Sequence, residues 1–155
     1  DVGGWTREWG LLVPAGNPDD VTGLADLVDR DLRFVNRDSN SGLRTSLSNA
    51  LAALAEDRGV ERRAVVDAVD GFDRAVRAHE SPARRVAAGN ADVGLGLATT
   101  AETLDLEFVP VGEAAVRVLV AHPRRGKPGV EALVDALASV PSLAAALRGY
   151  APDDA

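Results

Sequence analysis

The segment from Leu32 to Thr45 constrains the fold most, because it joins a strand, a short polar turn and the start of a helix. Leu32 to Val35 have strand composition, and either Ser39 or Ser41 stands where a helix N-cap is expected. Leucines then recur at helical spacing, at Leu43, Leu47, Leu51 and Leu54. Such a strand–turn–helix segment is typical of α/β layered domains.

The same turn predicts an anion site. The first turn of a helix leaves backbone N–H groups without acceptors, and the helix dipole favours negative charge there. Arg37 and Arg44 bracket the turn and add two guanidinium groups. Backbone donors, serine hydroxyls and arginines together suit a small oxyanion such as phosphate, sulfate or molybdate. The alternative is that the serines only cap the helix and the arginines are solvated.

Strand and helix patterns alternate along the rest of the chain, which predicts an α/β fold with a largely parallel sheet flanked by helices. A glycine at position 59 is expected to end the helix that starts near Gly42. The expected strands are 5–13, 32–35, 65–69, 91–96, 108–111 and 116–121. The expected helices are 22–28, 42–58, 73–88, 98–104, 128–138 and 141–148.

Composition narrows the function classes. The 155 residues, 46% of them hydrophobic, are enough for one compact domain with a core. With no cysteine the chain has no disulfide and no thiolate metal site, which fits a cytoplasmic setting. It contains no signal-like segment and no apolar run approaching the ~20 residues of a membrane span.

The charge balance bears on the partners. A net charge of −7 argues against direct binding to a nucleic-acid backbone, so DNA would be contacted only through a separate domain. Lys127 is the only lysine among 17 basic residues. This acidic, lysine-poor composition resembles that of proteins from salt-loving organisms, whose sites must rely on short, direct contacts because salt screens long-range attraction.

Other polar patterns favour no further site. Gly94-x-Gly96 follows a strand, but Thr99 stands where a dinucleotide motif has its third glycine. No nucleophile, base and acid can be grouped from the sequence, so we expect neither an enzyme nor a cofactor. A solvated acidic face is a better interpretation than a cation site for Asp67, Asp70 and Asp73.

Four sequence segments occur in order along the chain: residues 10–18, residues 33–37 leading to 41–44, His79 followed by 86–96, and residues 106–111. In this order the chain resembles the type II periplasmic-binding-protein-like domain of cytoplasmic proteins. Such domains are fused to molybdate-regulator-type helix-turn-helix proteins or to molybdopterin-biosynthesis proteins. The resemblance covers nearly the whole chain.

The resemblance implies a fold in which two α/β lobes clamp a ligand. It implies that residues 14–112 form one lobe, that 113–155 form the return segment, and that the chain is a fragment of a longer polypeptide. Arg37 would pair with the anion, and Gly42 would let the anion approach the backbone. Further contacts would come from the Ser41 hydroxyl, the N–H groups of Ser41 and Leu43, and His79, while Glu113 matches an acidic residue at the return to the other lobe.

The chain departs from the family pattern at several positions. Leu43 replaces a threonine, which removes one hydroxyl donor, and Ala78 replaces the threonine before the histidine. Ala115 and Val116 stand where a tyrosine and an aspartate are expected, and Pro82 where a valine is common. These changes bear on the identity of the ligand more than on the fold.

Three hypotheses follow. In the first, the chain is a sensor domain for molybdate, tungstate or another small oxyanion, with Arg37, Ser39, Ser41, Gly42, Leu43, Arg44 and His79 as site residues, and it regulates an attached DNA-binding module. In the second, it binds an organic molybdopterin-related molecule in a biosynthetic protein. In the third, the cleft is vestigial and the domain is an interaction module that forms a homodimer.

Overall fold

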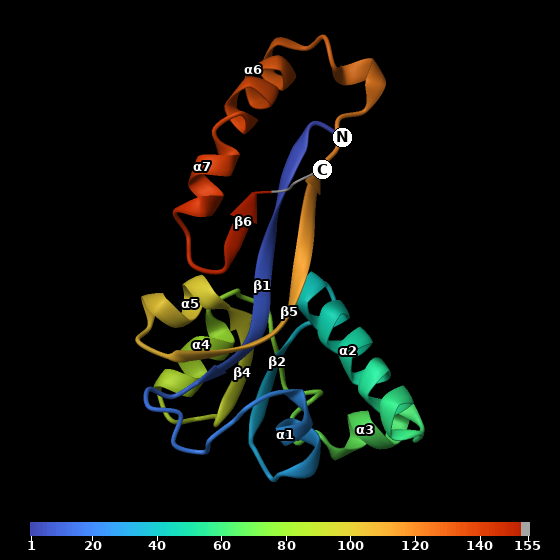
Figure 1. Cartoon of the computed structure of the whole chain (residues 1–155), viewed down its shortest axis with the longest axis vertical. Coiled ribbons are helices and arrows are strands. Elements are labelled where there is room, and N and C mark those ends of the chain that lie inside the picture. Colours follow the sequence, from blue (N-terminus) through green and yellow to red (C-terminus); the bar gives the residue numbers. More distant parts are fainter. Residues whose placement is uncertain (153–155) are drawn as a thin grey trace. The chain divides into compact units, whose positions relative to one another are not determined.

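The structure, a computed structural model, describes residues 1–152 and has the mixed α/β architecture that the sequence predicts (Figure 1). Its strands are β1 Gly3–Val13, β2 Phe34–Arg37, β3 Ala75–Val76, β4 Val93–Leu97, β5 Glu107–Val118 and β6 Tyr150–Pro152. Its α-helices are α1 Leu24–Asp29, α2 Gly42–Arg58, α3 Arg62–Ala68, α4 Ser81–Ala87, α5 Ala98–Thr103, α6 Pro128–Leu137 and α7 Val140–Ala145. A 3-10 helix, η1, covers His122–Arg124.

The chain divides into two compact units. Unit 2 is the continuous segment Trp9–Gly112, and unit 1 combines Asp1–Glu8 with the segment from Glu113 onward. The chain therefore passes between the units within β1 and again within β5. Unit 2 contains the segment 14–112, whose assignment as one lobe of a ligand-binding protein remains a prediction.

The sheet of unit 2 is parallel in its β3–β2–β4 part. Arg37 of β2 pairs with Val76 of β3, and Val35 of β2 pairs with Gly94 of β4. β1 runs antiparallel to β4, with Trp9 opposite Leu97. The ends of β2, β3 and β4 at Arg37, Val76 and Leu97 therefore share one side of the sheet, which we name the carboxyl edge. Ligands of open α/β sheets bind outside this kind of edge.

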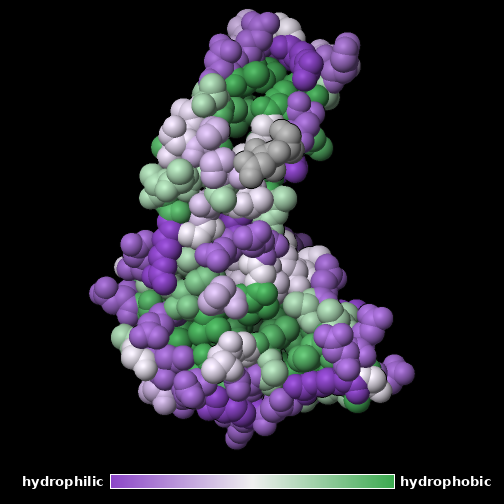
Figure 2. Space-filling view, viewed as in Figure 1, coloured by the Kyte–Doolittle hydropathy of each residue, from purple (hydrophilic) through white to green (hydrophobic). Residues whose placement is uncertain are grey.

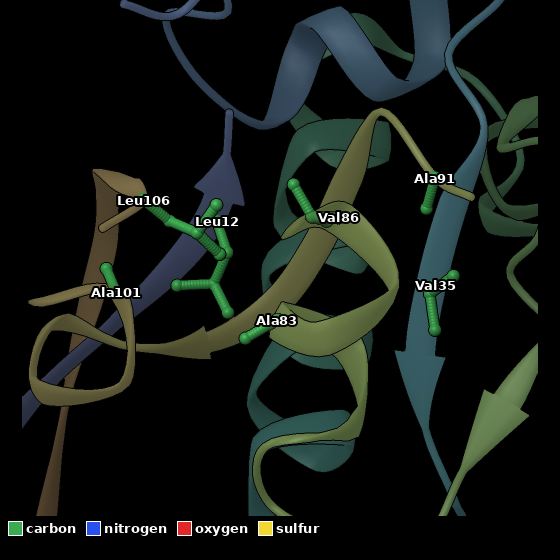
Figure 3. Close-up of a cluster of buried hydrophobic side chains, with 7 residues drawn as sticks. All are labelled: Leu12, Val35, Ala83, Val86, Ala91, Ala101 and Leu106. Carbon is green, nitrogen blue, oxygen red and sulfur yellow. The ribbon is translucent and has the colours of Figure 1, made fainter. Parts of the chain in front are cut away.

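Successive side chains of a strand point to opposite faces of the sheet, so the strands pack against one layer of helices on each face. One layer contains α2, which buries Leu43, Leu47 and Leu51 and contacts β2 and β4. In the other layer, α4 and α5 pack on the sheet through a cluster of small and branched residues (Figure 3). The cluster contains Leu12, Val35, Ala83, Val86, Ala91, Ala101 and Leu106.

The two glycines of β4 let this second layer lie close to the sheet. A Cβ on Gly94 would lie 3.0 Å from Pro82 Cβ of α4, and a Cβ on Gly96 would collide with the Leu12 side chain. Gly94 therefore makes room for α4, and Gly96 makes room for the Leu12 side chain of β1.

Three secondary-structure expectations are wrong. Residues 65–69 were expected as a strand, but residues 65–68 lie in α3 and Val69 is its C-cap residue; Val65 and Val69 recur at helical spacing and are both buried. The expected helix over 73–88 begins with β3 and becomes helical only at Ser81, because pairing with β2 overrides local propensity. The two strands expected over 108–111 and 116–121 form one strand, β5.

The long helix α2 has the predicted ends. It begins at Gly42 with Ser41 at the N-cap position and ends at Arg58. Gly59 follows in the left-handed conformation, with φ 63°, which glycine adopts without strain.

Unit 1 contains much less core than unit 2. The first part of β1 pairs with β6, with Thr6 opposite Ala151, and of the described residues of unit 1 only Ala144 is buried. Large apolar side chains are exposed at Leu119, Leu133, Leu143 and Leu147. Figure 2 shows hydrophobic surface around α6. Within residues 1–152 no helix has the length and apolar character needed to span a membrane.

Gly71 tests how closely the loop before β3 packs on β2. It has φ 100°, and a Cβ there would overlap the Phe34 carbonyl oxygen. Gly71→Ala should lower the free energy of unfolding by about 2–4 kcal/mol, because both backbone strain and overpacking oppose it. Gly59→Ala is the matched control, since a Cβ there meets open space; it should cost about 1–2 kcal/mol. Urea unfolding measures both, and equal losses would contradict this packing.

Candidate functional site

The predicted strand–turn–helix segment lies at the carboxyl edge. β2 ends at Arg37, and the turn that follows is closed by a hydrogen bond from the Ser41 N–H to the Asp38 carbonyl at 3.0 Å. The Asp38 carboxylate also accepts from the Asn40 N–H at 3.3 Å. The turn is therefore fixed by its own hydrogen bonds before α2 begins.

The start of α2 presents backbone donors at the surface. Ser41 is largely buried, and its side chain makes no capping hydrogen bond. Gly42 is exposed, and the space around its Cα is open, whereas the Leu43 side chain points into the core and is 1% exposed. The N–H groups of Gly42 and Leu43 have no acceptor inside the helix, as in any α-helix. This helix start therefore offers N–H groups and no side chain that would block an anion.

Arg37 is held by the turn that follows β3. Its side chain is 5% exposed, and its Nη2 donates to the Arg77 carbonyl at 2.9 Å. Its Nη1 lies 3.1 Å from His79 Nδ1. These two contacts orient the guanidinium. The structure thus brings together Arg37 and His79, which are far apart in the sequence.

Arg44 is oriented differently from Arg37. Its Nη1 donates to the Arg37 carbonyl at 3.0 Å, and its Nη2 lies 3.4 Å from an Asp73 carboxylate oxygen. The guanidinium carbon lies 4.7 Å from the centre of the Phe72 ring. These contacts make Arg44 a brace between α2, β2 and the loop before β3. Ser39 is exposed in the turn.

Asn36 helps to position the candidate site, and the sequence analysis did not identify it. It is fully buried, its Nδ2 donates to the Phe72 carbonyl at 2.9 Å, and its Oδ1 accepts from the Arg37 N–H at 2.8 Å. It therefore ties the residue before Arg37 to the loop that leads into β3. An amide in an otherwise apolar strand was the available signal, because buried polar groups are hydrogen-bonded.

The remaining candidates lie outside this arrangement. Glu113 belongs to unit 1, where with Thr6, Glu8 and Tyr150 it lines a cavity of about 240 Å³. The three aspartates that could suggest a cation site each contact an arginine. The pairs are Asp67 with Arg63, Asp70 with Arg74 and Asp73 with Arg44.

The candidate site is only partly open to solvent, because Ser39, Gly42 and His79 are exposed whereas Arg37 and Ser41 are buried. Two cavities of unit 2 are lined by residues that are close in the sequence to residues of the candidate site. One, of about 410 Å³, is lined by residues of the segment 66–74, and the other, of about 200 Å³, by Val76 and residues of the segment 81–90. Neither includes Arg37 or Ser41.

Comparison with known proteins gives a family and a fold. The PBP superfamily domain matches residues 2–138. The uncharacterised protein YvgK of Bacillus subtilis strain 168 is 33% identical over 114 residues, which are 74% of this chain and 34% of that protein. This chain thus spans about a third of the length of that relative.

Two solved structures share the fold. The sulfate-binding protein SubI of Mycobacterium tuberculosis H37Rv superposes with a TM-score of 0.66 at 16% identity, over 99% of this chain and 59% of SubI. The substrate binding domain of a Clostridium difficile protein assigned as a molybdenum ABC transporter gives a TM-score of 0.56 at 14% identity, over 99% of this chain and 66% of that domain.

Asn36 gives a test of how the site is held. Asn36→Ala would leave the Phe72 carbonyl and the Arg37 N–H without their buried partner, so the free energy of unfolding should fall by about 2–4 kcal/mol. Asn40→Ala, in the exposed part of the same turn, is the control and should change it by less than about 0.5 kcal/mol. Equal urea-unfolding midpoints for the two variants would contradict the role given to Asn36.

Proposed function

The chain belongs to the PBP superfamily, and we propose that it binds a small oxyanion of the sulfate and molybdate class at the start of α2. One observation carries the proposal. The 17-residue helix α2 begins at the carboxyl edge without a side-chain cap, and only a short turn separates its start from Arg37, whose guanidinium is oriented by a hydrogen bond. A helix N-terminus and an arginine are complementary to the charge and the geometry of a tetrahedral dianion.

The donor set supports an inorganic anion. The N–H groups of Gly42 and Leu43 supply the helix end, and the absent Gly42 side chain permits close approach. Ser41 adds a hydroxyl, and Arg37 adds a charged donor. Leu43 cannot replace the threonine hydroxyl of the related pattern, since its side chain is buried in the core. The proposed contacts therefore rely on backbone donors more than on hydroxyls.

The two solved relatives supply the ligand class. One is named for sulfate binding and the other for a molybdenum transporter. Sulfate and molybdate are both tetrahedral dianions, and we extend that chemistry to this chain. Sequence identities of 16% and 14% leave the choice between the two to experiment.

Calorimetric titration with sulfate, molybdate, tungstate and phosphate tests the proposal. Gly42→Asp should weaken the binding of the preferred anion at least tenfold, because a carboxylate at the helix start repels the anion. Gly42→Asn introduces a side chain of nearly the same shape as aspartate but without charge, so it should change the affinity far less. Arg37→Gln should abolish binding, and Arg63→Gln, an equal charge change on the exposed face of α3, should not. Circular dichroism checks that each variant is folded.

Equal affinities for Gly42→Asp and Gly42→Asn would contradict the position of the site. Absence of binding for all four anions to the wild-type protein would contradict the ligand class and would favour the organic or interaction alternatives.

The chain would act as a sensor within a longer polypeptide, regulating an attached DNA-binding module. Its net charge of −7 supports a division in which another segment contacts the DNA. In a mobility-shift assay of the complete encoded protein with its own promoter DNA, the preferred anion should change the apparent Kd for DNA at least tenfold. Gly42→Asp should remove this response, and DNA binding that ignores the anion would contradict regulation.

A further inference from the structure

We propose that the cavity lined by β3 and α4 binds a phosphate group, at a site separate from the oxyanion site at the start of α2. This cavity of unit 2 has a volume of about 200 Å³ and is lined by Val76, Ser81, Arg84, Arg85 and Asn90. The side chains of the last four carry hydrogen-bond donors, and two of them are guanidinium groups. The inference does not depend on the proposed function.

One face of α4 supplies three of the four polar side chains. Ser81, Arg84 and Arg85 are spaced i, i+3 and i+4, and residues at this spacing are neighbours on a helix surface. Another face of α4 packs on the sheet through Ala83 and Val86 (Figure 3). The three side chains are therefore carried by a helix whose position is fixed by the core.

The end of α4 places Asn90 beside Arg85. The Asn90 N–H donates to the Arg85 carbonyl at 2.9 Å, and the Gly89 N–H donates to the Val86 carbonyl at 2.9 Å. Gly89 has φ 73°, so the two hydrogen bonds and this glycine form a Schellman motif. The backbone turn thus adds a carboxamide to the hydroxyl and the guanidinium groups of α4.

Most of these donors are not used inside the protein. Within residues 1–152, the side chains of Ser81, Arg85 and Asn90 form no hydrogen bond and no ion pair. Arg84 donates through Nη2 to the Glu80 carboxylate at 2.7 Å. The side chains of this pair are 66% and 50% exposed, and an exposed ion pair contributes little stability, so an anion can compete for Arg84. Glu80 itself does not line the cavity.

The charge and the number of the donors favour phosphate over a carboxylate. A phosphate group has three terminal oxygens and close to two negative charges near neutral pH, whereas a carboxylate has two oxygens and one charge. Two guanidinium groups match the charge of phosphate, and their N–H groups suit its oxygens. The cavity is larger than a single oxyanion, which leaves room beside Val76 for the organic part of a phosphate ester.

NMR titration of the isotopically labelled protein with inorganic phosphate and with glycerol 3-phosphate tests the inference, at about pH 7.5, where both are mostly dianions. The Asn90 side-chain amide and the Arg85 Nε–H should shift in a saturable manner. The Gly42 and Leu43 amides report separately on the start of α2. Tighter binding of glycerol 3-phosphate in the cavity would assign the cavity to an organic phosphate, and equal affinities would assign it to free phosphate.

Three variants separate the cavity from the overall charge. Arg85→Gln should weaken the binding of glycerol 3-phosphate by about tenfold or more, because it removes a charge and several donors from the cavity. Arg62→Gln removes the same charge from an exposed side chain of α3 and should leave the affinity unchanged. Glu80→Gln should strengthen binding by about two- to fivefold, since it releases Arg84 and removes a nearby negative charge.

No saturable shift at Arg85 and Asn90 with either probe would overturn the inference. Equal losses of affinity for Arg85→Gln and Arg62→Gln would also overturn it, because they would indicate attraction by overall charge alone. Saturable shifts confined to Gly42 and Leu43 would overturn the cavity site and support the site at α2. Shifts confined to the cavity would support this inference and would leave the site at α2 to be decided by sulfate and molybdate.

Discussion

The end of β2 is held by hydrogen bonds from two consecutive buried polar residues to the segment around β3. Asn36 bonds to the Phe72 carbonyl, and Arg37 bonds to the Arg77 carbonyl and contacts His79. β3 itself has only two residues, so the strand pairing alone contributes little to this junction. These side-chain hydrogen bonds position Arg37 relative to the turn of residues 38–41, and α2 begins directly after that turn.

The two arginines that bracket the turn make different contacts. Arg44 contacts Asp73 and stacks on Phe72, whereas Arg37 donates to the Arg77 carbonyl and contacts the His79 imidazole. With a net charge of −7 the protein as a whole repels anions at long range. Salt screens that repulsion over about 8–10 Å. An anion site in such a chain must therefore depend on short contacts with backbone donors and one well-placed guanidinium.

The sequence predicted the strand, turn and helix of the site because apolar spacing and N-cap chemistry are local signals. It could not distinguish the two arginines, since Arg37 and Arg44 bracket the turn alike and only the fold directs one toward His79 and the other onto Phe72. The helical spacing of Val65 and Val69 was hidden by their β-branched composition, and β3 exists only through its pairing with β2. Asn36 was missed because its partner at Phe72 is remote in sequence.

The most direct measurement is NMR mapping of an oxyanion on the isotopically labelled protein. The account predicts that sulfate or molybdate shifts the backbone amides of Gly42 and Leu43 and the Arg37 side-chain Nε–H most strongly, in a saturable manner. It predicts small changes at α6 and α7. Largest shifts in unit 1, or weak, non-saturating shifts spread over the exposed arginines, would contradict a built anion site at the start of α2.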